Sequence, residues 1–387
     1  MKTINKYSLL LFICAALSIV IVGCDDDEGG EPRVSYIRIT RAASSDSLLV
    51  SAGQGQMIAI MGDNLQNTQE VWFNDQRATL TATFITNKSI IVRIPSDIPD
   101  EITNELRLVF ANGRTLTYDF TVDISKPLVN RMKSEYVNIG DVATFYGNFF
   151  YAPLEVTFTG GAQAEIVSVE DQILQVIVPD GAQPGPITIT SNFGETLTSQ
   201  WYLDDRNIFA DFEGPFANGF WRGDDFVVES DDDVPNINGK FVRVKRGDQG
   251  AWPYIEVYGG PADGDVAGLT KVIPEEAFLN PTAFSVKFEI NTVRSIAGAV
   301  MRLYLGDAPN DDFGEARNNI YYEWLANLDT QGEWETVTLP WSEVYAANQR
   351  FPYNSNGYGM YIYFHGPNAA TYDFAFDNFR VVPNKSE

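Results

Sequence analysis

The sequence is poor in cysteine, histidine and positive charge. Its 387 residues include two Cys and one His, and 27 basic residues stand against 52 acidic ones, a net charge of −25. Cys14 lies in an N-terminal apolar run, so the rest of the chain has no second cysteine with which Cys24 could form a disulfide. A lone His365 disfavours histidine-based metal sites and histidine-dependent catalytic triads. The acidic balance disfavours nucleic acid and anionic membrane surfaces as partners, while a neutral or cationic ligand stays open.

Long apolar runs are also scarce, and the run over residues 9–22 is too short to span a bilayer comfortably. Lys2 and Lys6 precede it, which is the layout of a secretory signal. Gly23 and Cys24 close the run, and a small residue just before a cysteine resembles the lipobox of bacterial lipoproteins. The resemblance implies cleavage before Cys24 and acylation of its sulfur and its freed amine, which together anchor a chain to a membrane. The alternative is an ordinary cleaved signal followed by a chance cysteine.

The acidic run over residues 25–28 resembles the surface-export signal of Gram-negative glycan-foraging bacteria. We therefore expect a lipoprotein signal peptide over residues 1–23 and a lipidated acidic tether over residues 24–33. The expected location is the cell outer membrane, with the chain lipid-anchored and facing the extracellular side.

No long helical pattern follows the tether, and short alternating runs between turn residues indicate β-sandwiches. Two stretches repeat one order: a Gly, an alternating strand, a Gly-Asn or Gly-Asp-Asn turn, a second strand, and a strand that stops at Pro. The corresponding segments are 55–65, 70–74 and 90–95 in the first repeat and 140–149, 154–158 and 174–181 in the second. This order resembles the immunoglobulin-like IPT/TIG domains. It implies two serial sandwiches, over residues 34–123 and 124–204, which we interpret as spacers.

A third, larger domain is predicted over residues 205–387, where aromatic residues become frequent. Its opening Asp-Phe-Glu at 211–213, its Gly-Lys-Phe at 239–241 and its closing Phe-Asp-Asn-Phe-Arg at 376–380 resemble β-jelly-roll carbohydrate-binding modules. The resemblance implies a structural calcium shared by the first and last strands, with Glu213 and Asp377 as acidic ligands among six to eight oxygens. The alternative is that both residues simply lie at strand edges. No cofactor is expected for function.

Strand alternation predicts an aromatic face on this third domain. In residues 252–258, Ile255 and Val257 lie on a side suited to a core, and the opposite side is mainly aromatic. Segments 301–305 and 360–365 show the same split. In segment 320–326, Tyr322 and Trp324 share a side, but Tyr321 and Leu325 also fit as a core pair, so the buried side there stays open. The residues expected at a glycan-binding site on this face are Trp252, Tyr254, Glu256, Tyr258, Arg302, Tyr304, Tyr322, Trp324, Tyr361 and Tyr363.

An aromatic ring stacks on the apolar face of a sugar and leaves the hydroxyls free, so a row of rings suits an extended polysaccharide. Taken as a whole, the chain resembles the B-type surface glycan-binding lipoproteins of polysaccharide-utilisation loci. That resemblance implies non-catalytic capture of a β-glucan, of the xyloglucan, mixed-linkage or β-1,3 class, beside an outer-membrane glycan transporter.

Two other classes stay open. A surface adhesion or scaffold protein would bind other proteins through its immunoglobulin-like domains. A glycoside hydrolase would need two carboxylates about 5 to 9.5 Å apart, and Glu256 with Glu289 or Glu323 are candidate pairs.

Overall fold

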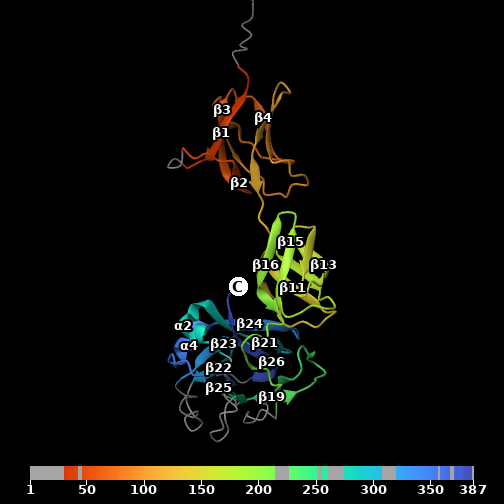
Figure 1. Ribbon diagram of the computed structural model, residues 1–387, viewed down its shortest axis with the longest axis vertical. Helices are drawn as coiled ribbons and strands as arrows, with labels where there is room; N and C mark the ends of the chain where they lie inside the picture. Colours follow the sequence, from red (N-terminus) through yellow and green to blue (C-terminus); the bar gives the residue numbers. More distant parts are fainter. Residues whose placement is uncertain are drawn as a thin grey trace, which may run out of the picture. The chain divides into compact units, whose positions relative to one another are not determined.

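The computed structural model describes residues 30–41, 46–213, 226–251, 255–259, 273–306, 320–355, 358–366 and 370–385. The chain divides into two compact units, Met1–Ser125 and Lys126–Glu387. Strands make up nearly all the regular structure of both units (Figure 1). The all-β prediction of two immunoglobulin-like sandwiches followed by a larger β-sandwich is therefore confirmed. Within the described ranges, no helix is both long and apolar enough to cross a membrane.

The first unit is a sandwich of two small sheets. One sheet has the order β1 (Arg33–Ile39), β3 (Met57–Asp63), β6 (Ser89–Arg93), and the other β5 (Gln76–Arg77), β4 (Thr68–Phe73), β7 (Glu105–Phe110), β8 (Thr115–Asp119). A short parallel pair, β2 (Ser51–Gly53) with β9 (Thr121–Asp123), lies beside them. Alternate residues such as Ile90 and Val92 enter the core between the sheets, as strand geometry requires.

The second unit begins with a sandwich of similar design. Its sheets have the orders β10 (Leu128–Met132), β11 (Val142–Asn148), β14 (Ile173–Ile177), β13 (Glu165–Glu170) and β12 (Leu154–Thr157), β15 (Gly185–Ser191), β16 (Gly194–Tyr202). Phe145, Val156 and Leu174 lie in its core.

A close approach of two strands explains the glycine that both repeats share. Gly62 lies against the carbonyl of Arg33 and Gly147 against that of Leu128, so closely that a Cβ at either position would overlap the oxygen. Each contact occurs beside an irregularity in the register of the paired strand. A side chain would push the two strands apart, and glycine is therefore required at both positions.

The larger sandwich of the second unit packs two sheets face to face. The central sheet has the order β18 (Val227–Val228), β19 (Phe241–Gln249), β26 (Ala370–Pro383), β21 (Phe284–Thr292), β24 (Trp334–Pro340), and β17 (Ile208–Ala210) also pairs with β26. The outer sheet has the order β20 (Ile255–Gly259), β25 (Gly359–His365), β22 (Ala299–Gly306), β23 (Tyr322–Ala326). Helices α2 (Glu275–Leu279) and α4 (Trp341–Ala347) are short. The core is rich in phenylalanine, as in the stacked pair Phe288 and Phe379, whose ring centroids lie 4.5 Å apart.

A buried charge network joins the second immunoglobulin-like sandwich to the central sheet. Arg380, fully buried, donates to Glu135 Oε2 at 2.6 Å and to Glu289 Oε2 at 2.7 Å. Lys287 forms an ion pair with the same Glu135. Two cations thus meet two carboxylates, which is the condition under which buried charges are tolerated.

Backbone and apolar contacts complete this junction. The N–H of Thr336 donates to the carbonyl of Lys133 at 2.8 Å, and the hydroxyl of Thr336 accepts from the N–H of Glu135 at 2.8 Å. Tyr136 packs with Phe241 and Trp334 in a shared apolar cluster. Burial raises the pKa of Tyr136, so its hydroxyl stays protonated and donates to the carbonyl of Asp204. The second immunoglobulin-like sandwich and the large sandwich are therefore held together as one unit.

Candidate functional site

The middle strand of the outer sheet, β22, shows which side of that sheet faces the core. Met301 and Leu303 point into the core and are fully buried. The register places Trp324 opposite Met301 and Tyr322 opposite Leu303. Residues directly opposite in neighbouring strands share a face, so Tyr322 and Trp324 also face the core. Trp324 packs edge-on against Phe288 of the central sheet, with ring centroids 5.5 Å apart.

The prediction that Tyr322 and Trp324 face outward is therefore wrong. The alternation in β23 could not decide the matter, because both sides of the strand carry large apolar side chains. Packing decides it, because the inward-facing indole ring of Trp324 is partly buried and packs against Phe288. Leu325 lies on the other side and remains 59% exposed.

The strand register pairs the positions of most of the remaining predicted residues. The register joins two rows across the sheet, and these are Glu256–Tyr363–Arg302–Glu323 and Tyr258–Tyr361–Tyr304. Strand pairing therefore brings these positions into two adjacent rows, and their role as a glycan-binding face stays a prediction. Trp252 and Tyr254 lie outside the described residues.

Two tyrosines of these rows are buried, contrary to the expectation that they form an exposed surface. Tyr304 and Tyr363 are each only 4% exposed. The hydroxyl end of Tyr304 lies over Gly306, where a Cβ would overlap it. Both rings are therefore too covered to form an exposed binding surface.

Arg302 is the best-defined polar group of the outward face. Its guanidinium stacks over the ring of Tyr321, with 4.1 Å between its central carbon and the ring centroid. Its Nε donates to Glu323 Oε2 at 3.3 Å. The ring, the guanidinium and the carboxylate hold one another in place beside exposed Leu325. This combination offers an apolar surface for a sugar ring together with a donor and an acceptor for its hydroxyls.

Sequence reasoning missed Tyr321, which it had treated as a core candidate. The signal that could have placed it is the pairing of β23 with β22. Once Leu303 is known to face inward, its partner Tyr322 must also face inward, and the preceding Tyr321 must face outward.

Glu213 and Asp377, the predicted calcium ligands, have other partners in the structure. The exposed Glu213 accepts a hydrogen bond from the N–H of Lys240. The fully buried Asp377 accepts from the N–H of Asn378 at 2.8 Å and from its side-chain amide at 3.0 Å. Burial raises the pKa of both carboxyl groups, that of Asp377 well above its usual range. In the part of the chain that the structure describes, no group of three or more His, Cys, Asp or Glu could hold a metal ion. The calcium site stays a prediction.

The carboxylate pairs considered for hydrolysis gain no support from the geometry. Glu289 is fully buried and paired with Arg380, so it has no access to a substrate. Glu323 lies on the outward face of the opposite sheet, paired with Arg302.

Two family models match the chain. Residues 202–383 match the model described as the surface glycan-binding protein B xyloglucan binding domain. The C-terminal domain is therefore similar to the surface glycan-binding protein B domains. Residues 46–122 match the IPT/TIG domain model, which covers most of the first immunoglobulin-like sandwich.

Known proteins are similar to this chain at low identity. The crystal structure of the surface glycan-binding protein PbSGBP-B from Prevotella bryantii is similar to 92% of this chain and 99% of that one, with a TM-score of 0.70 and 26% identity. An SGBP-B from a complex xyloglucan utilization locus in Bacteroides uniformis aligns over 92% and 100% of the two chains, with a TM-score of 0.49 and 19% identity. An IPT/TIG domain-containing protein of Bacteroides ovatus is 29% identical over 204 residues, 50% of this chain. The match spans only 39% of that relative's length.

Proposed function

We propose that this protein is a non-catalytic, lipid-anchored surface protein that captures a β-glucan on the outward face of the outer sheet. The observation that carries the proposal is the similarity to PbSGBP-B, which extends over nearly the full length of both chains at 26% identity. Support for this location is that residues 202–383, which match a glycan-binding domain model, include the Arg302, Tyr321 and Glu323 cluster.

The proposed ligand is a neutral glucan chain of the xyloglucan, mixed-linkage or β-1,3 class. The name of the matching family model favours xyloglucan within this set. Stacking on a ring such as Tyr321 contributes roughly 1 kcal/mol, if it behaves as aromatic pairs do. A few such contacts on an open surface give a dissociation constant between micromolar and millimolar. Many anchored copies that face one polymer raise the avidity without any new contact.

The proposed cellular location rests on the N-terminal sequence. Acylated Cys24 would hold the chain at the outer membrane, and the acidic tether would carry it to the extracellular side. From there the protein would hold glucan for an outer-membrane transporter of the same utilisation system.

Isothermal titration tests the proposal directly. Residues 25–387, produced without the signal and the lipid, are titrated with xyloglucan, mixed-linkage glucan, laminarin, mannan, xylan and starch, and each mixture is assayed for released reducing sugar. We expect heat with one or more β-glucans and no sugar release. No binding heat with any of the six polysaccharides would favour an adhesion role, and release of reducing sugar would identify a hydrolase.

A further inference from the structure

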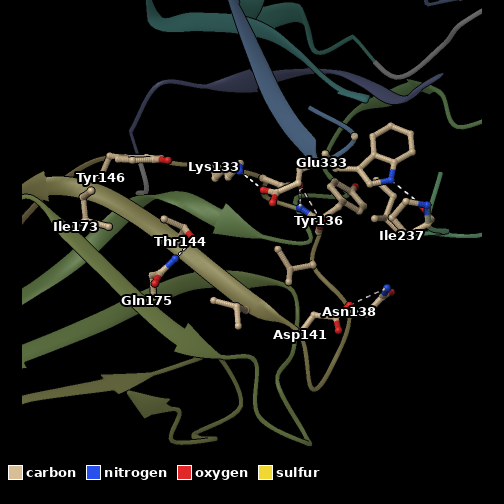
Figure 2. A pocket seen from close by; sticks show the side chains of 16 residues that line it. Lys133, Tyr136, Asn138, Asp141, Thr144, Tyr146, Ile173, Gln175, Ile237 and Glu333 are labelled. Atoms are coloured by element: carbon tan, nitrogen blue, oxygen red, sulfur yellow. Dashed lines mark hydrogen bonds and ion pairs between the residues drawn. The ribbon is translucent and has the colours of Figure 1, made fainter. Parts of the chain in front are cut away.

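A groove of about 560 Å³ lies within the second unit, where the second immunoglobulin-like sandwich meets the large sandwich (Figure 2). One wall is the outward side of β11 and β14, where the register sets Thr144 opposite Gln175 and Tyr146 opposite Ile173. The other wall includes Glu333 and the following Trp334. The volume falls within the range of small-molecule sites.

The walls of this groove are held in fixed positions. Beside it, the Arg380, Glu135 and Glu289 network locks the two sandwiches together. Among its lining residues, Lys133 forms an ion pair with Glu333, and Asn138 donates its amide to the carbonyl of Asn236 at 2.9 Å. A ligand would thus find the groove already formed, without the cost of ordering two domains.

The lining chemistry suits a neutral, hydroxyl-rich ligand. Lys133 and Glu333 cancel one another's charge, the carboxylate of Asp141 accepts from the amide of Asn138, and the chain's net charge of −25 opposes an anionic ligand. Gln175 bonds to Ser168 and Thr144 and still has hydrogen-bonding capacity, since an amide offers two donors and two acceptor lone pairs. Tyr146 supplies a ring, held by the guanidinium of Arg131 at 4.0 Å.

We infer that this groove is a second binding site for a segment of the same neutral polysaccharide, separate from the outward face of the outer sheet. The inference rests on the proposed function, because the occupant is the glucan proposed above. It gives the second immunoglobulin-like sandwich a binding role in addition to its position as a spacer. Two sites on one unit raise the affinity for a long polymer over that for a short oligosaccharide.

A matched pair of surface variants tests the groove. Val142 lines the groove and is 44% exposed, whereas Val167, 51% exposed on β13 of the same sandwich, is not among its lining residues. Val142→Arg fills the groove with a long cationic side chain, and Val167→Arg makes the same chemical change elsewhere. Both positions are exposed, so neither change should cost much stability, which thermal unfolding checks.

We expect Val142→Arg to weaken binding of the best polysaccharide by about fivefold or more, as the loss of one or two good contacts would. Val167→Arg should leave binding unchanged. Hydrogen exchange of residues 25–387 with and without that polysaccharide should show protection over 141–147 and 172–177. Equal binding by both variants with no such protection would show that the groove is not a binding site, and the proposed function would be unaffected. Equal weakening by both would also overturn it, as an effect of charge alone. No binding of any glucan by the unmodified chain would overturn both proposals.

Discussion

Trp324 stabilises the large sandwich from inside, because its indole ring bridges the two sheets through Phe288. We expect Trp324→Ala to lower the free energy of unfolding by about 3 kcal/mol, the usual cost of removing a packed indole. Denaturant unfolding of residues 25–387 measures the change. An unchanged midpoint together with lost glucan binding would show instead that the ring contacts the ligand.

Tyr321 belongs to the opposite face, and its replacement should have the opposite effect. Tyr321→Ala removes the ring under the Arg302 guanidinium without touching the core. We expect glucan affinity to fall about fivefold, since one stacking contact contributes roughly 1 kcal/mol, and the unfolding midpoint to stay within experimental error. Titration calorimetry and thermal unfolding on the same sample check both halves. Undiminished glucan binding would show that Tyr321 is not part of the binding site.

Asp377 is the residue that decides the predicted calcium site. A buried carboxylate that lacks a cation is costly, and a calcium ion held by Asp377 and Glu213 would remove that cost for Asp377. If the prediction holds, millimolar calcium raises the melting temperature over that in EDTA, and Asp377→Asn abolishes the difference. Identical melting curves in calcium and EDTA would show that the two carboxyl groups serve only the hydrogen bonds made to them by Asn378 and Lys240.

At the scale of the strand, sequence patterns predicted where the strands lie in the chain better than which side of each strand faces the core. The alternation in β22 was unambiguous, because Met301 and Leu303 are aliphatic while Arg302 is charged. The neighbouring β23 has large side chains on both sides, so only its pairing with β22 determines which side is buried. Alternation also indicates the side of the sheet on which a side chain lies but not how exposed that side chain is. Tyr304 therefore lies on the predicted face and is nevertheless buried.

The junction between the two sandwiches was beyond sequence reasoning for a different reason. Glu135 and Arg380 are 245 positions apart, and charged residues at such positions look like ordinary surface groups. Only folding brings them together and removes both from water. The glycines of the two repeats, in contrast, were visible from sequence because one backbone contact requires the same residue twice.

Glu135 tests the strength of this junction. Glu135→Gln keeps the size of the side chain but leaves Arg380 and Lys287 with a single buried carboxylate, that of Glu289. Breaking a buried ion pair from one side costs about 3 to 5 kcal/mol. The matched control is Glu333→Gln, which removes an ion pair with Lys133 at the same junction from a side chain that is 65% exposed. Such an exposed pair contributes about 1 kcal/mol at most.

Denaturant unfolding of the two variants side by side measures the difference. We expect a large loss of stability for Glu135→Gln and almost none for Glu333→Gln. Equal, small losses would mean that water reaches Arg380 and that the network contributes little to holding the sandwiches together.

At the scale of the whole molecule, the division of the chain places the second immunoglobulin-like sandwich with the large sandwich, in the unit Lys126–Glu387. The shared cluster of Tyr136, Phe241 and Trp334 gives this unit a continuous apolar contact across the junction. A fragment of residues 126–387 should therefore unfold in one cooperative transition, whereas residues 205–387 alone would expose that apolar patch to water. We expect the shorter fragment to melt about 5 °C lower or more, since each kcal/mol lost shifts the midpoint by roughly 2 to 4 °C in a domain of this size.

Scanning calorimetry of the two fragments, with a hydrophobic dye to report exposed apolar surface, checks this expectation. Two separate transitions in residues 126–387, and equal melting of the large sandwich in both fragments, would show that the second immunoglobulin-like sandwich is an independent spacer. One transition, with dye binding only in the shorter fragment, would show that the large sandwich depends on its neighbour for stability. Glucan affinities measured on residues 205–387 would then describe a destabilised domain without the groove, and the binding unit to compare with the full chain would begin at Lys126.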